Sequence, residues 1–305
     1  MPEQKQAQVP GSVALGEVGR RLERLRTRTG LTLSDAAAHC TEHGLRTDAS
    51  ALSRIENGRR RTIPRDLVTA LLDHYRAGAE DRAEILKLLS LDPSPSARRR
   101  RPALWRRHRA LLDPMGFEQF MELEAQATEL SNYEPALVPG LLQTAAYAHH
   151  AITGIRPELT PAQIEALCDV RLHRQHIIAE GPLREFEALI DEDVLHRTIG
   201  GPAVMRQQLE HLLTASESPT TTLRVVPRTP GSHPGLAGPF VIMNFPEATH
   251  AREIVWIETL STSVRLDQEM EVTHYTDAFT LLSGRALDPA QSRIRLKEKI
   301  QEHST

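Results

Sequence analysis

The sequence has few cysteines and no long hydrophobic run. Its 305 residues include only two cysteines, Cys40 and Cys168, which lie far apart and have no evident ligand residues beside them. This argues against a disulfide scaffold and against a cysteine zinc site. No stretch approaches the ~18 uninterrupted apolar residues that a membrane span needs. The first residues lack the basic and apolar regions of a signal peptide, so we expect a cytoplasmic protein.

Lysine is also scarce, with four residues, so arginine supplies nearly all of the positive charge. The charge is unevenly distributed: residues 1–112 carry a net charge of +9, residues 113–305 carry −12, and the whole chain carries −3. A basic part beside an acidic part indicates that only one of them meets a polyanion. The length and the ordinary content of hydrophobic residues predict a globular protein of about two domains.

Helical spacing and capping residues predict five short helices in the basic part. The expected helices cover residues 15–29, 33–40, 48–57, 64–74 and 79–89, and residues 41–47 form a turn. We therefore expect a disordered leader at 1–14, an all-α domain at 15–91 and a basic linker at 92–112. The run Arg98–Arg101 in this linker either touches phosphates or keeps the linker extended.

The stretch "DASALSRIENGRRR" at 48–61 follows the plan of a helix-turn-helix, in which one helix enters the major groove of DNA. Leu52 and Ile55 lie three residues apart and face the helical bundle. The residues expected to face the bases are Ala49, Ser50, Ser53 and Arg54. The residues expected to contact phosphates are Thr32, Asn57, Arg59, Arg60 and Arg61. In isolation, such an arginine run would more simply be a solvated surface.

The segments "LRTRTGLTLSDAA" and "ASALSRIENGRR" resemble the Cro/XRE-type helix-turn-helix of phage repressors and bacterial regulators. In that family an arginine late in the first helix pairs with the glutamate of the "ENG" segment. The resemblance implies a structural ion pair between Arg26 and Glu56. The turn between Ala37 and Asp48 is longer than is usual in the family.

The acidic part has alternating predicted helices and strands. The expected helices cover 116–131, 141–152, 161–179, 202–215, 265–283 and 288–301. The expected strands cover 183–190, 221–227, 239–245 and 252–259. We therefore expect an α+β domain at 113–285 with a small, mostly antiparallel sheet, followed by a C-terminal helix and tail at 286–305.

This part also resembles a group of actinobacterial helix-turn-helix regulators that share a C-terminal domain of unknown function. The resemblance is carried by "LE..A" at Leu123, "Y.P.L.PGLLQT..YA" from Tyr133, "R..RQ" from Arg171, an acidic segment at 191–200 and "LRVVP" from Leu223. The signature residues it implies are Tyr133, Pro139, Gly140, Gln143, Tyr147, Arg174, Gln175 and Glu192. It further implies a transcription regulator of antitoxin-like type whose gene neighbours one for a small partner protein.

No residue pattern indicates catalysis. Asp191, Glu192 and Asp193 form an acidic cluster of the kind that is usually solvated. His173 and His176 lie three apart on a predicted helix but have no evident third ligand. The Gly/Pro-rich segment 229–239 is not a phosphate loop; it is a hairpin loop between strands or a lid over a pocket. We therefore expect no enzymatic activity, no cofactor and no metal.

The expected partner is double-stranded DNA, with nucleoid association when bound. Three roles remain open for the acidic domain. It joins two chains into a homodimer, it binds a small basic protein, or it holds a small-molecule effector in a pocket. Repression, including of the protein's own promoter, is typical of the family that the chain resembles. An alternative main role is sequestration of the partner protein.

Overall fold

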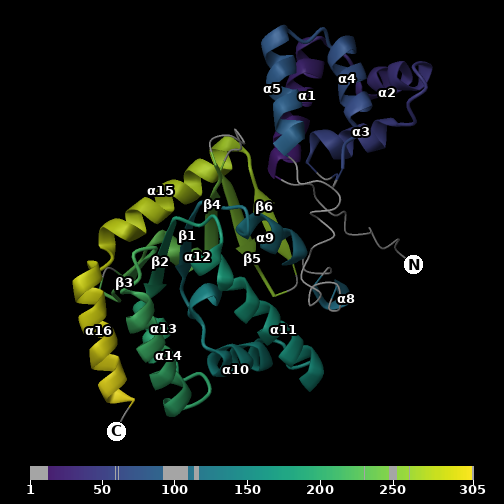
Figure 1. Ribbon diagram of the computed structural model, residues 1–305. Helices are drawn as coiled ribbons and strands as arrows, with labels where there is room; N and C mark the ends of the chain where they lie inside the picture. The colour runs from purple at the N-terminus through teal and green to yellow at the C-terminus, as the bar shows by residue number, and fades with distance from the viewer. Residues whose placement is uncertain are drawn as a thin grey trace. The chain divides into compact units, whose positions relative to one another are not determined.

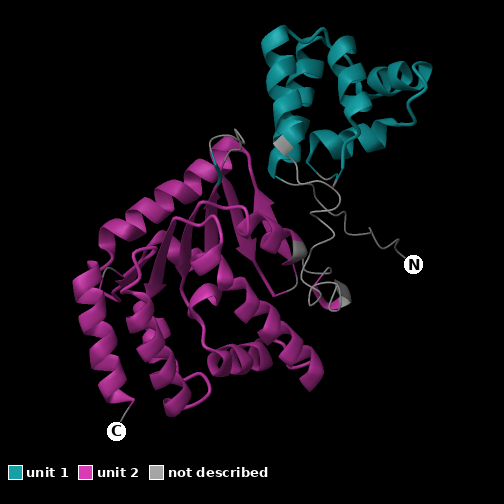
Figure 2. Cartoon of the chain, in the orientation of Figure 1, with its two compact units in different colours: residues 1–101, 245–252 teal, residues 102–244, 253–305 magenta. Residues whose placement is uncertain are grey.

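The computed structural model describes residues 13–58, 60, 62–91, 109–112, 117–229, 231–246, 253–260 and 262–303. The chain divides into two compact units, residues 1–101 with 245–252 and residues 102–244 with 253–305 (Figure 2). We call these the N-terminal and the C-terminal unit. Residues 1–12 of the expected leader and residues 92–108 of the expected linker, with Arg98–Arg101, lie outside the described residues. The last four residues expected in the linker form a helix, α8 (Arg109–Leu112).

The N-terminal unit consists of helices, as the sequence predicted. They are α1 (Val13–Arg28), α2 (Leu33–Glu42), α3 (Ala49–Glu56), α4 (Arg65–His74) and α5 (Ala79–Leu91) (Figure 1). Two boundaries differ from expectation. Helix α1 begins at Val13, which is buried and lies inside the leader expected at 1–14. Helix α2 continues to Glu42, so the turn expected at 41–47 is shorter.

The core of this unit forms where α1 crosses α3. Leu15, Val18 and Leu22 recur on one face of α1 and are fully buried with Leu52 and Ile55 of α3. The crossing is close because α1 carries Gly19 at this point: a Cβ atom there would lie 2.1 Å from the carbonyl oxygen of Ile55. The absence of a side chain at Gly19 thus sets the distance between α1 and α3.

The C-terminal unit combines helices with one sheet (Figure 1). Its strands are β1 (Glu129–Glu134), β2 (Glu185–Asp191), β3 (Thr221–Val226), β4 (Phe240–Asn244), β5 (Ile254–Glu258) and β6 (Ser263–Leu266). Its α-helices are α8 (Arg109–Leu112), α9 (Phe117–Glu124), α10 (Ala145–Ile155), α11 (Pro161–Arg174), α12 (His176–Glu180), α13 (Glu192–His196), α14 (Pro202–Ala215), α15 (Glu269–Arg285) and α16 (Pro289–Glu302). Two short 3-10 helices, η2 (Gly140–Leu142) and η3 (Pro234–Ala237), complete the described elements.

The α+β class is confirmed, but the sheet is larger than expected and is mixed. Its six strands have the order β3-β2-β1-β4-β5-β6, in which β3, β2 and β1 pair in parallel and the remaining pairs are antiparallel. Helical crossovers that start at η2 and α13 connect the parallel strands, as parallel pairing requires. Because β3 and β4 are not neighbours, segment 229–239 is not a hairpin loop; it crosses past β2 and β1 and contains η3.

Two further expectations for the acidic part were wrong. The helix expected at 116–131 ends at Glu124, and its last residues belong to β1. The helix expected from 265 begins at Glu269, after β6. Helix α16, expected as a helix and tail beyond the domain, packs against α14 and β3 with Leu296 fully buried. It is therefore an integral layer of the C-terminal unit.

Strand β1 presents different chemistry to the two faces of the sheet. Tyr133 packs with Val255 and with Phe279 of α15 in an apolar core. Asn132 and Glu134 point to the opposite face, because side chains alternate along a strand.

Of the helices in the described residues, none combines the length and the apolar character that a membrane span requires.

Candidate nucleic-acid interface

Helix α3 is a short helix with a defined start and end. The Asp48 carboxylate accepts a hydrogen bond of 2.6 Å from the backbone N–H of Ala51 and so caps the N-terminus. At the other end Gly58 has a φ of +63°, a left-handed conformation that stops the helix at little cost only in glycine. These caps hold the helix at Ala49–Glu56, within the predicted 48–57.

The two faces of α3 differ as the sequence predicted. Leu52 and Ile55 are 1% exposed and point into the core. Ser50 is exposed, and Ala49, Ser53 and Arg54 are partly exposed. Arg54 forms no hydrogen bond or ion pair with the described residues of the chain, so its guanidinium is available to an external acceptor.

Arg26 and Glu56 fix the end of α3. Nε and Nη2 of Arg26 donate to the two carboxylate oxygens of Glu56 at 2.8 and 2.7 Å, and Nη1 donates to the carbonyl oxygen of Leu31 at 2.9 Å. Glu56 is buried, and its carboxylate raises the pKa of Arg26. One planar guanidinium thereby joins α1, the turn before α2 and the last residue of α3.

The expected phosphate-contacting residues have different surroundings. Thr32 is the N-cap of α2, and its hydroxyl donates to the Asp35 carboxylate at 2.7 Å, so its proton is already used within the chain. Asn57 is exposed, and its amide donates to the Ser53 carbonyl at 2.8 Å. Arg60 is exposed and unpaired among the described residues. Arg59 and Arg61 lie outside the described residues.

The sequence reasoning did not single out Arg46. This exposed residue lies immediately before α3 and makes no hydrogen bond or ion pair with the rest of the described chain. Its position two residues before the N-cap Asp48 places a free cation beside the N-terminus of the candidate recognition helix. A basic residue just before a helix cap was the signal that could have identified it.

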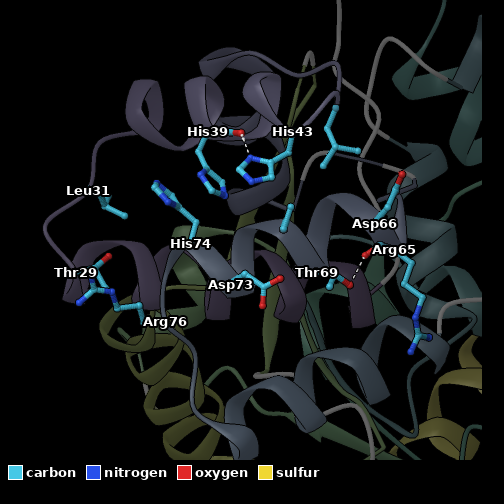
Figure 3. Close-up of a pocket in the computed structure, with 12 residues that line it drawn as sticks. Thr29, Leu31, His39, His43, Arg65, Asp66, Thr69, Asp73, His74 and Arg76 are labelled. Atoms are coloured by element: carbon cyan, nitrogen blue, oxygen red, sulfur yellow. Dashed lines mark hydrogen bonds between the residues drawn. The ribbon is translucent and has the colours of Figure 1, made fainter.

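A cavity of about 1150 Å³ lies in the N-terminal unit between α2 and α4 (Figure 3). His39 stacks on His74 with ring centroids 4.0 Å apart and lies 4.2 Å from His43. Burial and then the neighbouring His39 lower the pKa of His74. The lining also mixes Arg65 with Asp66 and further charges of both signs, so it does not suit a polyanion. No group of His, Cys, Asp and Glu among the described residues could hold a metal ion.

The expected signature residues of the C-terminal unit gather from distant positions. Arg171 donates to the Gln143 side chain at 2.8 Å, and Gln175 donates to the Gln143 carbonyl at 2.6 Å. Arg174 donates to both carboxylate oxygens of Glu124, at 2.7 and 2.6 Å. The segments "LE..A", "PGLLQT" and "R..RQ" therefore meet in space.

Most of the remaining signature residues contact neighbouring segments of the same unit. Pro139 is the N-cap of η2, and a Cβ at Gly140 would lie 3.7 Å from the Arg174 guanidinium. The hydroxyl of Tyr147 accepts a hydrogen bond from the Val138 N–H at 3.1 Å. Tyr133 donates to Asp191 at 3.4 Å.

The acidic cluster at 191–193 is not simply solvated. Asp191 and Glu192 are buried, and only Asp193 is exposed. Glu192 accepts hydrogen bonds from the Arg295 guanidinium at 2.7 Å and from the backbone N–H of Arg228 at 3.1 Å. Glu192 thus joins α13 to α16. The acidic residues beside it in the sequence gave no sign of this structural role.

The N-terminal unit is a helix-turn-helix domain: a model described as "Helix-turn-helix domain" matches residues 17–85, which indicates DNA binding. A second model, "Domain of unknown function (DUF5753)", matches residues 117–298. Since this match covers more than half of the chain, the chain belongs to the DUF5753 family. No curated protein and no solved structure matches the chain.

Proposed function

We propose that the chain is a sequence-specific transcription regulator that inserts α3 into the major groove of double-stranded DNA. The observation that carries the proposal is the arrangement of α3 within the matched helix-turn-helix domain. Its apolar face is buried in the core and its C-terminal end is fixed by Arg26. Its outer face carries Ser50 and Arg54, and Arg54 has no hydrogen-bond or ion-pair partner in the part of the chain that the structure describes.

The side chains on α3 suggest a division of roles. Ala49 and Ser50 are small residues at the tip of the helix and allow close approach to the bases. Ser53 donates to or accepts from several bases, and Arg54 binds guanine through O6 and N7. The exposed Arg60 binds phosphate, together with Asn57 and the neighbouring Arg59 and Arg61 by their position in the sequence. Thr32 donates to a phosphate only if the hydrogen bond from its hydroxyl to Asp35 breaks.

The C-terminal unit supplies the second half of the proposal. One recognition helix covers a short half-site, so we propose that two chains form a homodimer and bind two half-sites about one helical turn or a multiple apart. The net charge of −12 over residues 113–305 supports binding of a small basic protein encoded by a neighbouring gene. The proposed outcome is repression, including of the chain's own promoter, in the cytoplasm and without an enzymatic reaction.

The test is binding of the full-length protein to DNA from its own upstream region and to random DNA of equal length. Measurements at ~50 and ~200 mM salt separate specific from phosphate-driven binding. We expect selective binding that persists at the higher salt and a footprint with two half-sites. Equal affinity for both DNAs, with a loss of ~10³ or more between the two salt concentrations, would contradict sequence-specific recognition.

A further inference from the structure

The C-terminal unit contains a cavity of about 360 Å³ on the face of the sheet to which Asn132 and Glu134 point. Along this face Asn132 pairs with Val241 and Val241 with Trp256, so all three side chains share one side. Helices α9, α10 and α11 supply the other walls. The volume lies at the lower end of the range typical of small-molecule sites.

The lining of the cavity is apolar on most sides. Its apolar residues include Phe117, Phe120, Leu130, Leu141, Ile152 and Trp256. Six charged side chains lie within this apolar lining: Glu134 from β1, Glu258 from β5, Glu124 from α9, Arg171 and Arg174 from α11, and Arg156 from the end of α10. Arg156 forms an ion pair with Glu158. An apolar cavity with a few converging polar groups is the usual composition of a ligand site.

These charges are not all compensated. Arg174 forms its bidentate pair with Glu124 and lies 4.7 Å from the centroid of the Phe120 ring, so its guanidinium is already bound within the wall. Glu134 and Glu258 form no ion pair with any described residue, and Arg171 donates to the neutral Gln143. Once the pairs Arg174–Glu124 and Arg156–Glu158 are set aside, the lining retains two carboxylates and one guanidinium. These three groups carry an excess of one negative charge when both acids are ionised.

The carboxylate of Glu258 also disfavours the ionisation of Glu134. Burial, followed by the repulsion from Glu258, raises the pKa of Glu134 to about 8. The side chain of Glu258 is exposed and lines the cavity. Desolvation by the surrounding protein raises the pKa of Glu258, Arg174 and Arg171 oppose that shift, and Glu124 adds to it. A cation placed between the two acids would remove this repulsion, whereas an anion would add to it.

We infer that this cavity binds a small amphipathic cation, with an amine at the carboxylates of Glu134 and Glu258 and an apolar body against Phe120 and Trp256. The inference does not rest on the proposed function, because it concerns the C-terminal unit alone. A chain that fails to bind DNA can still bind the cation, and the two outcomes are measured separately.

The test uses three probes that share an apolar body: 4-phenylbutylamine, 4-phenylbutanol and 4-phenylbutyrate. Each is titrated calorimetrically into the full-length protein, without DNA, at pH ~8, near the pKa of Glu134. We expect the amine to bind about tenfold or more tightly than the alcohol, and the acid to bind weakest. Equal binding of amine and alcohol, tighter binding of the acid, or no binding of any probe overturns the inference.

Charge-neutral variants locate the site. Glu134→Gln and Glu258→Gln keep the side-chain shape, and each is expected to weaken amine binding about tenfold while leaving alcohol binding unchanged. Glu165→Gln is the matched control, because Glu165 is exposed on α11 and does not line the cavity. An equal loss in the control places the amine elsewhere on the acidic surface and contradicts the assignment. The comparison of the three probes on the unmodified protein remains decisive if a variant does not fold.

Discussion

Arg26 and Glu56 are thirty positions apart in the chain, yet the guanidinium and the carboxylate meet through two parallel hydrogen bonds of 2.8 and 2.7 Å. Both side chains are largely buried, at 15% and 6% exposed. The pair therefore stabilises the fold more than a surface salt bridge does, because little water reaches it to screen the charges. It fixes the angle at which α3 leaves the core, and hence the direction in which Ser50 and Arg54 point.

Removal of one partner of this pair is expected to be costly. Glu56→Ala leaves the Arg26 guanidinium buried without its counter-charge, and we expect the N-terminal unit to lose on the order of 3–5 kcal/mol of unfolding free energy. The double variant Arg26→Met, Glu56→Leu should regain most of this loss, because it removes both charges. Hydrogen exchange of the α1 and α3 amides in the full-length chain measures this unit separately. Unchanged exchange in Glu56→Ala would show that the pair has no structural role.

The two arginines at α3 should have separable effects on DNA. Arg54→Ala is expected to cost about 1–3 kcal/mol on the preferred site and to relax selectivity at one base position, because a guanine contact is lost. Arg60→Ala should weaken binding to all sequences alike and reduce the salt slope by about one. Affinity measured over a set of single-base variants separates the two. The control is Arg206→Ala, an exposed arginine on α14. Identical selectivity profiles for Arg54→Ala and Arg60→Ala would refute the orientation of α3.

The contact between α1 and α3 gives a third prediction. A Cβ at Gly19 would lie 2.1 Å from the Ile55 carbonyl oxygen, and neither backbone can yield without moving a helix. Gly19→Ala is therefore expected to destabilise the N-terminal unit by about 1–3 kcal/mol or more. Gly78→Ala is the control, since a Cβ there has no neighbour within 4 Å. Equal thermal stability of the two variants would be the contrary result.

The N-terminal unit could be predicted because its information is local. Thr32 and Asp48 cap the helices that follow them, and Leu52 and Ile55 show the buried face by their spacing alone. Strand β1 was missed for a physical reason. Its residues Asn132 and Glu134 are polar because they face a cavity, so the strand lacks the apolar alternation that marks a half-buried strand.

The cavity could not be predicted from sequence because its charged groups come from distant segments. Glu124, Glu134, Arg171 and Glu258 lie on four different elements. The order of the strands in the sheet, together with the helical crossover between β1 and β2, brings them together. The same holds for Glu192, whose partner Arg295 lies 103 positions away. In the sequence each of these residues looks like an ordinary surface charge.

The raised pKa of Glu134 makes stability depend on pH in a defined direction. Its pKa is about 8 in the folded chain and near 4.5 in an exposed glutamate, so between these values the folded state holds a proton that the unfolded chain releases. The unfolding free energy should therefore fall as the pH rises from about 5 to about 8. Glu258, Glu124, Arg156, Arg171 and Arg174 also line this cavity. Their charges contribute to the same dependence.

Glu134→Gln removes the titrating group and should flatten this dependence. The variant is expected to match the unmodified protein closely at pH ~5 and to exceed its unfolding free energy by up to about 4 kcal/mol at pH ~8. Urea unfolding followed by Trp fluorescence, with Glu165→Gln as the control, provides the comparison. Saturating 4-phenylbutylamine should narrow the difference, because the bound cation stabilises the ionised carboxylate only in the unmodified protein. If the unfolding free energies of the variant and the unmodified protein differ by the same amount at both pH values, Glu134 is ionised throughout this range. Its negative charge would then not destabilise the folded chain.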